Sequence, residues 1–245
     1  MIFMVRRLSD IQTRKSDIFV VSYPRSGNSW VRFMLSTYLH DIKTDWTNFK
    51  EHCPMMYHTD NISLNRIKSP RVIGSHELYD QVPNSVYIIR DPRDVMISQY
   101  FYNLKRGHID CDFDEWFDRF VNEKPRSFGS WKENVKSWFN HADYFIFYEH
   151  LLEDTHQELE NIICNVTDTN TFNRDRIDKS VEWCRFENMK RLEHKQGYLK
   201  SESKRNIPFM RKGKSKQWQV FLSNDQQNIF YNKFKGILDT LNYDK

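Results

Sequence analysis

The chain has 245 residues, of which 39% are hydrophobic and 29% are charged, and its formal net charge is +4. A chain of this length can bury one sizeable core, and no internal repeat or linker rich in proline, glycine or serine divides it. The mild positive charge suits an anionic ligand but gives no reason to expect a nucleic-acid partner. We therefore expect a single domain over residues 1–245.

Cysteine spacing and hydropathy indicate where in the cell the protein is expected. The four cysteines are widely spaced and include no CxxC pair, so the sequence suggests neither a zinc knuckle nor a disulfide framework. His and Cys residues at positions 52–58 lack a second ligand cluster, and we expect no metal site. No apolar stretch is long enough to cross a bilayer or to form the core of a leader. A cytoplasmic protein without membrane insertion is expected.

Residues 17–32 join an apolar strand to a helix through a compact polar loop. A strand is predicted at residues 18–22, and apolar side chains at three- and four-residue spacing predict a helix over residues 30–38. Backbone N–H groups at such a helix start point at whatever lies in front of them. Together with Arg25 and two hydroxyl groups, they could form a cradle for a phosphate- or sulfate-like anion. The alternative is a tight turn with a structural role only.

The remaining pattern alternates strands with helices. Residues 41–65 show no clear period and are expected to be irregular or short helices. Strands are predicted at residues 71–76, 85–90 and 144–148, and helices at 91–101, 113–121, 131–139, 151–166 and from Ser223 onward. This order favours an α/β domain with a central, mainly parallel sheet flanked by helices. Functional loops are then expected at the carboxyl ends of the strands.

Two further segments carry residues suited to anions. Arg90 ends a predicted strand, and Ser98 lies about two helical turns later, so a guanidinium and a hydroxyl could hold one phosphate. The alternative is that Arg90 pairs with Asp91 or Asp94. The basic run at residues 211–216, expected to be a loop, places two cations beside a glycine, although such a run is often only solvated.

The first loop resembles a P-loop without matching it. The spacing GxxxxGK[ST] is absent, which disfavours an NTP-hydrolysing enzyme. Residues 23–30, 90–98 and 211–213, in this order, instead resemble the nucleotide-binding elements of the cytosolic-type sulfotransferases. These enzymes transfer a sulfuryl group from 3′-phosphoadenosine 5′-phosphosulfate (PAPS) and release 3′-phosphoadenosine 5′-phosphate (PAP). The first segment is similar to their 5′-phosphosulfate loop and the other two to their 3′-phosphate segments.

The resemblance extends over about residues 17–218 and implies roles for individual side chains. His76, at the end of a predicted strand, would be the general base that removes the acceptor proton, with Glu77 as the fallback. Arg25 would stabilise charge on the leaving phosphate, so the implied catalytic residues are His76 and Arg25. The residues implied in nucleotide binding are Arg25, Ser26, Gly27, Asn28, Ser29, Trp30, Arg90, Ser98, Tyr148, Phe186, Arg211, Lys212 and Gly213.

Three of these residues, Trp30, Tyr148 and Phe186, would stack on adenine according to the resemblance, although each could equally be a core aromatic. The acceptor is expected to be a small organic molecule with a hydroxyl or amine group, in an apolar and aromatic pocket. The residues expected to line that pocket are Trp46, Met55, Met56, Tyr57, Tyr79, Tyr102, Phe128 and Trp131.

The chain departs from the family pattern at several positions. Many relatives have Lys-Thr-His where this chain has residues 74–76, Gly-Ser-His, so one cation near the phosphosulfate is missing and Arg25 or another residue would replace it. Most relatives carry lysine at the position of Arg25, although arginine occurs in similar bacterial sequences. The dimer signature that follows Trp218 in many members is degraded, so the resemblance implies no oligomeric state.

The sequence therefore predicts a PAPS-dependent sulfotransferase acting on a hydroxyl or amine. One alternative is a nucleotide-dependent phosphotransferase. Such an enzyme requires a Lys-Ser/Thr pair and a magnesium ion held by carboxylates, and neither is evident in the sequence. The other is a catalytically silent protein that binds phosphoadenosine nucleotides, which the missing lysine before His76 alone encourages.

Overall fold

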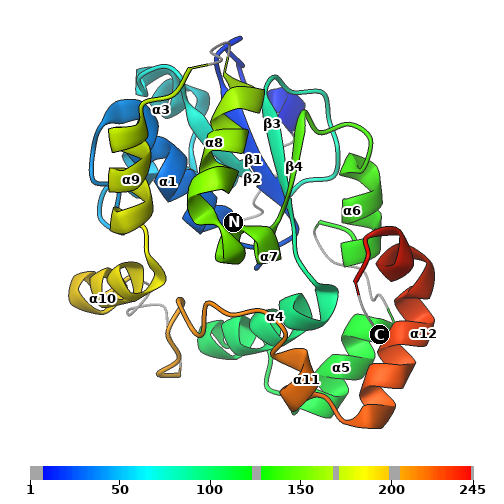
Figure 1. The fold of residues 1–245 in the computed structure, drawn as a ribbon. Coiled ribbons are helices and arrows are strands. Elements are labelled where there is room, and N and C mark those ends of the chain that lie inside the picture. The colour runs from blue at the N-terminus through cyan, green and yellow to red at the C-terminus, as the bar shows by residue number, and fades with distance from the viewer. Residues whose placement is uncertain (1–7, 123–127, 168–170, 199–204, 244–245) are drawn as a thin grey trace.

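The computed structural model of the protein describes residues 8–122, 128–167, 171–198 and 205–243 (Figure 1). Its centre is a parallel sheet with the strand order β2-β1-β3-β4. The strands are β1 (Ile18–Ser22), β2 (Val72–Ser75), β3 (Ser85–Ile89) and β4 (Tyr144–Phe147). All residues of β1, β2 and β3 are buried, as expected for strands covered on both faces. The prediction of an α/β fold with a central parallel sheet is confirmed.

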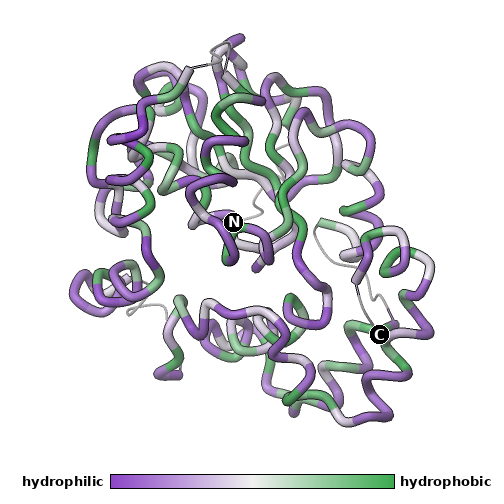
Figure 2. The backbone as a smooth tube through the Cα atoms, viewed as in Figure 1, coloured by the Kyte–Doolittle hydropathy of each residue, from purple (hydrophilic) through white to green (hydrophobic). Residues whose placement is uncertain are grey.

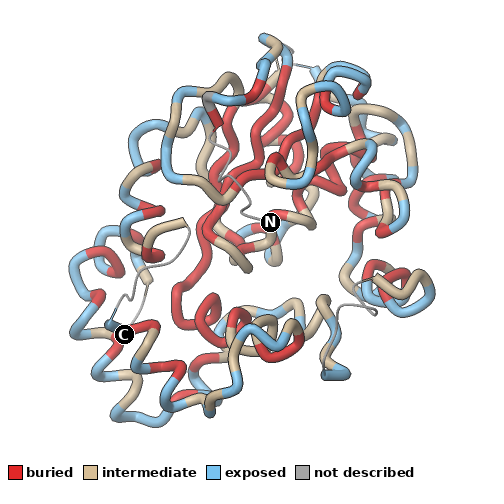
Figure 3. The backbone as a smooth tube through the Cα atoms, turned by 180° about the vertical axis from the view of Figure 1, so that it is seen from behind, coloured by how far each residue is buried: buried red, intermediate tan, exposed pale blue. Residues whose placement is uncertain are grey.

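Side chains that alternate along the strands build two hydrophobic cores, one on each face of the sheet. Ile18 and Val20 of β1 belong to one core, and Phe19 and Val21 belong to the other. The hydrophobic colouring of the strands in Figure 2 and their burial in Figure 3 show this central position.

Helices cover both faces. The first core is closed by α1 (Asn28–His40), α8 (Thr155–Val166), α9 (Arg174–Trp183) and α10 (Phe186–Gln196). The second is closed by α4 (Pro92–Arg106), α5 (Phe113–Val121), α6 (Trp131–Trp138), α11 (Trp218–Phe221) and α12 (Asn224–Thr240). Short elements complete the described parts: α2 (Phe49–His52), α3 (Asn61–Arg66), α7 (Tyr148–Glu153) and the 3₁₀ helices η1 (Leu8–Asp10) and η2 (Met56–His58).

Most predicted elements are found, with one helix divided differently. The predicted helix at residues 151–166 is two helices, α7 and α8, because Asp154 leaves helical geometry (φ −142°, ψ 83°) and caps α8 by accepting from the Gln157 N–H. The predicted strand at residues 144–148 ends at Phe147, and Tyr148 begins α7. The sequence did not indicate α9 or α10. Asp91 caps α4, with Pro92 in its first turn, as predicted.

Candidate active site

Parallel strands bring their carboxyl ends to one edge of the sheet, and most of the predicted site residues lie there. The loop at residues 23–27 follows β1, and His76 follows β2. Arg90 follows β3, and Tyr148 follows β4. Four segments that are far apart in the sequence therefore meet at this edge.

The loop between β1 and α1 is held in an unusual backbone conformation. Arg25 (φ 76°) and Gly27 (φ 103°) both adopt positive φ angles, and Gly27 caps α1. A Cβ atom on Gly27 would lie 2.8 Å from Cδ2 of Tyr148, so only glycine fits. The Ser26 hydroxyl is buried and has no hydrogen-bond partner among the described residues. This conformation thus places an unpartnered hydroxyl just before α1, where the first backbone N–H groups of a helix have no partner within the helix.

Asn28, predicted to contact the nucleotide, uses its side chain within the protein. Its amide nitrogen donates to the Val20 carbonyl (2.8 Å) and the Ser75 carbonyl (3.3 Å), which joins α1 to two strand ends. Its amide oxygen accepts from Nε of Arg32 (2.7 Å). The ligand contact left to Asn28 is therefore through its backbone N–H.

Arg25 connects two of the predicted anion-binding segments. Its Nε donates to the Ser98 hydroxyl (3.2 Å), and its Nη2 donates to the Phe209 carbonyl (3.0 Å). The guanidinium also lies over the rings of Tyr102 (4.9 Å to the centroid) and Phe209 (4.4 Å). The loop after β1, helix α4 and the chain before residue 211 therefore converge on this side chain.

Arg90 makes the corresponding contacts with the third segment. Its two terminal nitrogens donate to the carbonyls of Arg25 and Lys214, each at 3.0 Å, and the guanidinium lies 4.2 Å from the centre of the Tyr148 ring. Asp91 pairs with Arg93 at 2.7 Å rather than with Arg90, and the contact between Arg90 and Asp94 is long, at 4.0 Å. In the described parts of the chain, Nε of Arg90 is buried without a partner.

The electrostatics of this cluster favour an anion. Burial lowers the pKa of Arg25 to about 10; the positive charges of Arg90 and Arg211 contribute to this shift, and Tyr102 and Tyr198 oppose it. Burial also raises the pKa of Asp94 to about 6, although the charge of Arg90 opposes this shift. The charges of Arg25, Arg90 and Arg211 therefore act on one another in a region with little solvent, which favours the binding of an anion there.

The three predicted adenine-stacking residues make two separate contacts, one between Trp30 and Tyr148 and one between Phe186 and Gly213. Trp30 and Tyr148 meet edge to face, with ring centres 6.0 Å apart and planes at 70°. Phe186 lies against Gly213 so closely that a Cβ atom there would come within 2.3 Å of its ring. Lys212 is exposed.

Arg211, the other member of the basic segment, is engaged away from Arg25 and Arg90 in this structure. It donates to the Gln217 side chain (2.6 Å), and its guanidinium lies over the Phe101 ring (4.5 Å to the centroid). The basic segment is thus in place beside the site, with its arginine held by α4 and the start of α11.

His76 is fixed in one tautomer by its position after β2. Its Nδ1 lies 2.7 Å from the Ser22 carbonyl oxygen, which can only accept a hydrogen bond. The proton therefore resides on Nδ1, and Nε2 keeps its lone pair. Burial lowers the pKa of His76 to about 4, and the charges of Arg32 and Arg25 act in the same direction, whereas the bond to Ser22 opposes them. The imidazole is accordingly neutral at physiological pH.

Aromatic rings and an amide hold His76 in place. The rings of Tyr57 and Phe128 pack against each other, 5.3 Å apart, on one side of the imidazole, 6.4 Å and 5.6 Å from its centre. The Tyr57 hydroxyl accepts from the His76 N–H (2.6 Å). The side chain of Asn134, in α6, donates to the carbonyls of His76 (2.9 Å) and Phe128 (3.2 Å). The Tyr87 hydroxyl donates to Asn134 in turn (2.8 Å). Sequence reasoning missed Asn134 because its partners come from distant segments.

The predicted acceptor pocket is only partly assembled. Of its eight residues, Tyr57 and Phe128 lie together beside His76. The other six residues make different contacts. Trp46 stacks on Tyr198, and Tyr79 stacks on His141. Tyr102 lies beside Arg25, Met55 lies against Gly74, and Met56 and Trp131 belong to the core. Apolar character alone does not distinguish a pocket wall from a core, so the acceptor pocket stays a prediction.

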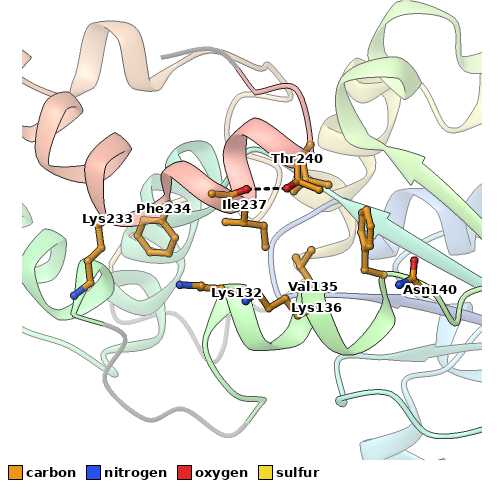
Figure 4. Close-up of a pocket in the computed structure, with 11 residues that line it drawn as sticks. Lys132, Val135, Lys136, Asn140, Lys233, Phe234, Ile237 and Thr240 are labelled. Atoms are coloured by element: carbon orange, nitrogen blue, oxygen red, sulfur yellow. Dashed lines mark hydrogen bonds between the residues drawn. The ribbon is translucent and has the colours of Figure 1, made fainter.

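Two cavities lie outside this site. One, of about 620 Å³, lies between α6 and α12 and is lined by residues such as Lys132, Lys136 and Ile237 (Figure 4). The other, of about 800 Å³, is bordered by α1, α9 and α10. Neither contains a predicted catalytic or nucleotide-binding residue.

Comparison with known proteins places these features in a family. A model of the sulfotransferase domain matches residues 15–241. The chain belongs to the sulfotransferase family. It is 24% identical over 249 residues to an amine sulfotransferase from Oryctolagus cuniculus, covering 93% of this chain and 82% of the relative. It is 26% identical over 255 residues to sulfotransferase 1B1 from Mus musculus, covering 91% and 83% of the two chains.

Solved structures share the fold of this sulfotransferase. A retinol dehydratase in complex with androsterone and the inactive cofactor PAP superimposes with a TM-score of 0.76 at 19% identity, covering 92% of this chain and 81% of that one. The sulfotransferase is an enzyme that uses PAPS as its sulfuryl donor, which confirms the predicted family, reaction and donor. Among the described helices, none combines the length and the hydropathy that spanning a membrane requires.

Proposed function

We propose that His76 is the general base of this sulfotransferase and that the acceptor is a small organic molecule with a hydroxyl or amine group. The observation that carries the proposal is the hydrogen bond between Nδ1 of His76 and the Ser22 carbonyl (2.7 Å). It leaves Nε2 as the basic nitrogen of a neutral ring, in a position after β2 that adjoins the anion-binding loop.

The donor is proposed to bind across the converging segments. Its fit is supported by three buried polar atoms that lack a partner in the described parts: the Ser26 hydroxyl, Nε1 of Trp30 and Nε of Arg90. The loop N–H groups, with Arg25, Ser26 and Ser29, would hold the 5′ end. The residues proposed for the 3′-phosphate are Arg90, Ser98, Arg211, Lys212 and Gly213, and those for adenine are Trp30, Tyr148 and Phe186.

The chain's own groups then account for the transfer. The bound donor supplies the sulfuryl group and a phosphate leaving group. As the acceptor oxygen or nitrogen bonds to sulfur, its proton passes to Nε2 of His76, and the bond between sulfur and the 5′-phosphate oxygen breaks. Arg25 stabilises the negative charge that develops on that phosphate, and the loop amides orient it.

The acceptor class follows from the surroundings of His76. Tyr57 and Phe128 form a pair of aromatic rings beside the imidazole, and such an apolar surface suits a flat or apolar molecule. The name of the amine sulfotransferase relative and the androsterone bound to the retinol dehydratase are consistent with a small organic acceptor. A cytoplasmic location stays a prediction from the sequence.

Replacing His76 with alanine tests the proposed base. We expect His76→Ala to lower kcat by about 10²- to 10⁴-fold, the usual contribution of a general base, and to change the Kd for PAP by less than about threefold. Glu77→Gln is the matched control, because it alters the neighbouring carboxyl group and should retain the transfer rate. Transfer is measured by the mass shift of a model phenol or amine. A His76→Ala variant that transfers at the original rate would refute the assignment.

A further inference from the structure

Arg32, in the second turn of α1, is a buried cation without a carboxylate partner. Its exposed fraction is 2%, and within the described ranges it forms no ion pair. Its acceptors are all neutral: the Asn28 amide oxygen (2.7 Å), the Cys53 carbonyl and, at 3.5 Å, the Ser29 hydroxyl. A buried guanidinium is costly unless a negative charge compensates it, and no described residue supplies one to Arg32.

The side chain of Arg32 points to the place where an anion is expected. Helix side chains lean toward the N-terminus, and Arg32 accordingly reaches the first turn of α1, at Asn28 and Ser29. That end of the helix carries partial positive charge, which makes a cation there unfavourable on its own. Ser26, two residues before the start of α1, is 1% exposed, and its hydroxyl has no partner among the described residues. Both observations call for a negative group.

Gly74 provides the space that Arg32 occupies. A Cβ atom at residue 74 would lie 2.7 Å from Nε and 2.8 Å from Cδ of Arg32, and 2.5 Å from Sδ of Met55. The guanidinium therefore lies against β2, two residues before His76, and its charge helps to lower the pKa of His76. Arg32 is thus located between the anion-binding loop and the proposed base.

We infer that Arg32 is a second cation of the donor site and binds the sulfuryl oxygens of PAPS, on the side of the donor that faces His76. The inference rests on the proposed function of that site. It also explains the glycine at residue 74: the cation is supplied by α1 rather than by β2, and a side chain on β2 would exclude it. Arg25 contacts Ser98 and Phe209 and serves the other side of the donor.

The test compares two nucleotides that differ by the sulfuryl group. We expect Arg32→Met to weaken PAPS binding by at least about tenfold, the value of a lost charge-assisted hydrogen bond, and PAP binding by less than about threefold. Calorimetry without acceptor measures both constants. Arg119→Met, which removes an exposed arginine of α5 paired with Glu115, is the control and should change neither. Equal weakening of both nucleotides would assign Arg32 a structural role and overturn the inference.

Two further variants keep the test decisive if Arg32→Met folds poorly. Arg32→Lys should retain part of the preference for PAPS, because it keeps the charge with fewer donors. The triple variant Arg32→Ala, Met55→Ala and Gly74→Lys removes both side chains that a residue at 74 would meet and returns a cation from β2, so it should recover PAPS preference relative to Arg32→Ala with Met55→Ala. If Arg32→Lys lost all preference for PAPS and the cation at residue 74 restored none, the inference would be contradicted. A parent chain that bound neither nucleotide would instead refute the donor site itself.

Discussion

At the scale of single residues, burial keeps His76 neutral, and the hydrogen bond from its Nδ1 to the Ser22 carbonyl leaves Nε2 as the basic nitrogen. The role of His76 as the base stays a prediction, but its position after β2 was predictable from the apolar pattern and the family resemblance. Asn134 and Arg32 were not, because their partners lie at residues 76, 128 and 53, which only the folded chain brings together. A charged residue within the apolar helix at residues 30–38 was the one available signal for Arg32.

The pH dependence of turnover follows from the environment of His76. Burial lowers the pKa of this imidazole to about 4 from its usual 6.5, and a general base must be neutral to accept a proton. Transfer should therefore persist well below pH 6.5, and the acid limb of the kcat/KM profile should lie nearer pH 4. The profile is measured from pH 4 to 8 with a saturable model acceptor.

A stability control accompanies that profile. In the unfolded chain His76 takes up a proton as the pH falls through 6.5, whereas the folded chain does so only near pH 4. His76 therefore contributes a loss of stability as the pH falls below 6.5, and circular dichroism at each pH must show that the enzyme is still folded. An acid limb at pH 6.5 or above in folded enzyme would contradict the assigned environment.

At the scale of elements, the junctions between strands and helices were more predictable than the helices that cover them. The segment from β1 to α1 carries a strong apolar strand, a glycine and a periodic helix, and all three are found. Helix α9 reads RDRIDKSVEW, in which only Ile177, Ser180 and Val181 are buried. So weak an apolar stripe gives no periodic signal, and the helix forms because it packs against α1 and α8.

Two glycine substitutions test the loop conformation. Gly27→Ala should lower the free energy of unfolding by about 1–3 kcal/mol, because φ is 103° and the new methyl group would lie 2.8 Å from Tyr148. Gly236→Ala is the matched control in α12, where a Cβ meets nothing within 4 Å, and it should add about 0.5–1 kcal/mol. Urea unfolding measures both. Equal effects of the two changes would contradict the described loop geometry.

At the scale of the whole molecule, the sheet brings segments that are far apart in the sequence to one edge of the fold. Strand order β2-β1-β3-β4 places the residues after β1 between those after β2 and β3, so that the loop at 23–27 adjoins both His76 and Arg90. This arrangement could be predicted in outline from alternating strands and helices. The position of the chain around residues 209–214 could not, because it has no regular structure and is held by contacts to Arg25, Arg90 and Glu193.

The central claim is that three distant segments bind one nucleotide that carries both a 5′ and a 3′ phosphate. Thermal unfolding with PAP, AMP and ATP, each at the same concentration, tests it most directly, because AMP lacks only the 3′-phosphate of PAP. At 100 times its Kd, PAP should add about 2.7 kcal/mol and raise the Tm by about 5–10 °C. We predict a clearly larger shift with PAP than with AMP or ATP. A shift with AMP or ATP that equals or exceeds that of PAP would contradict the account.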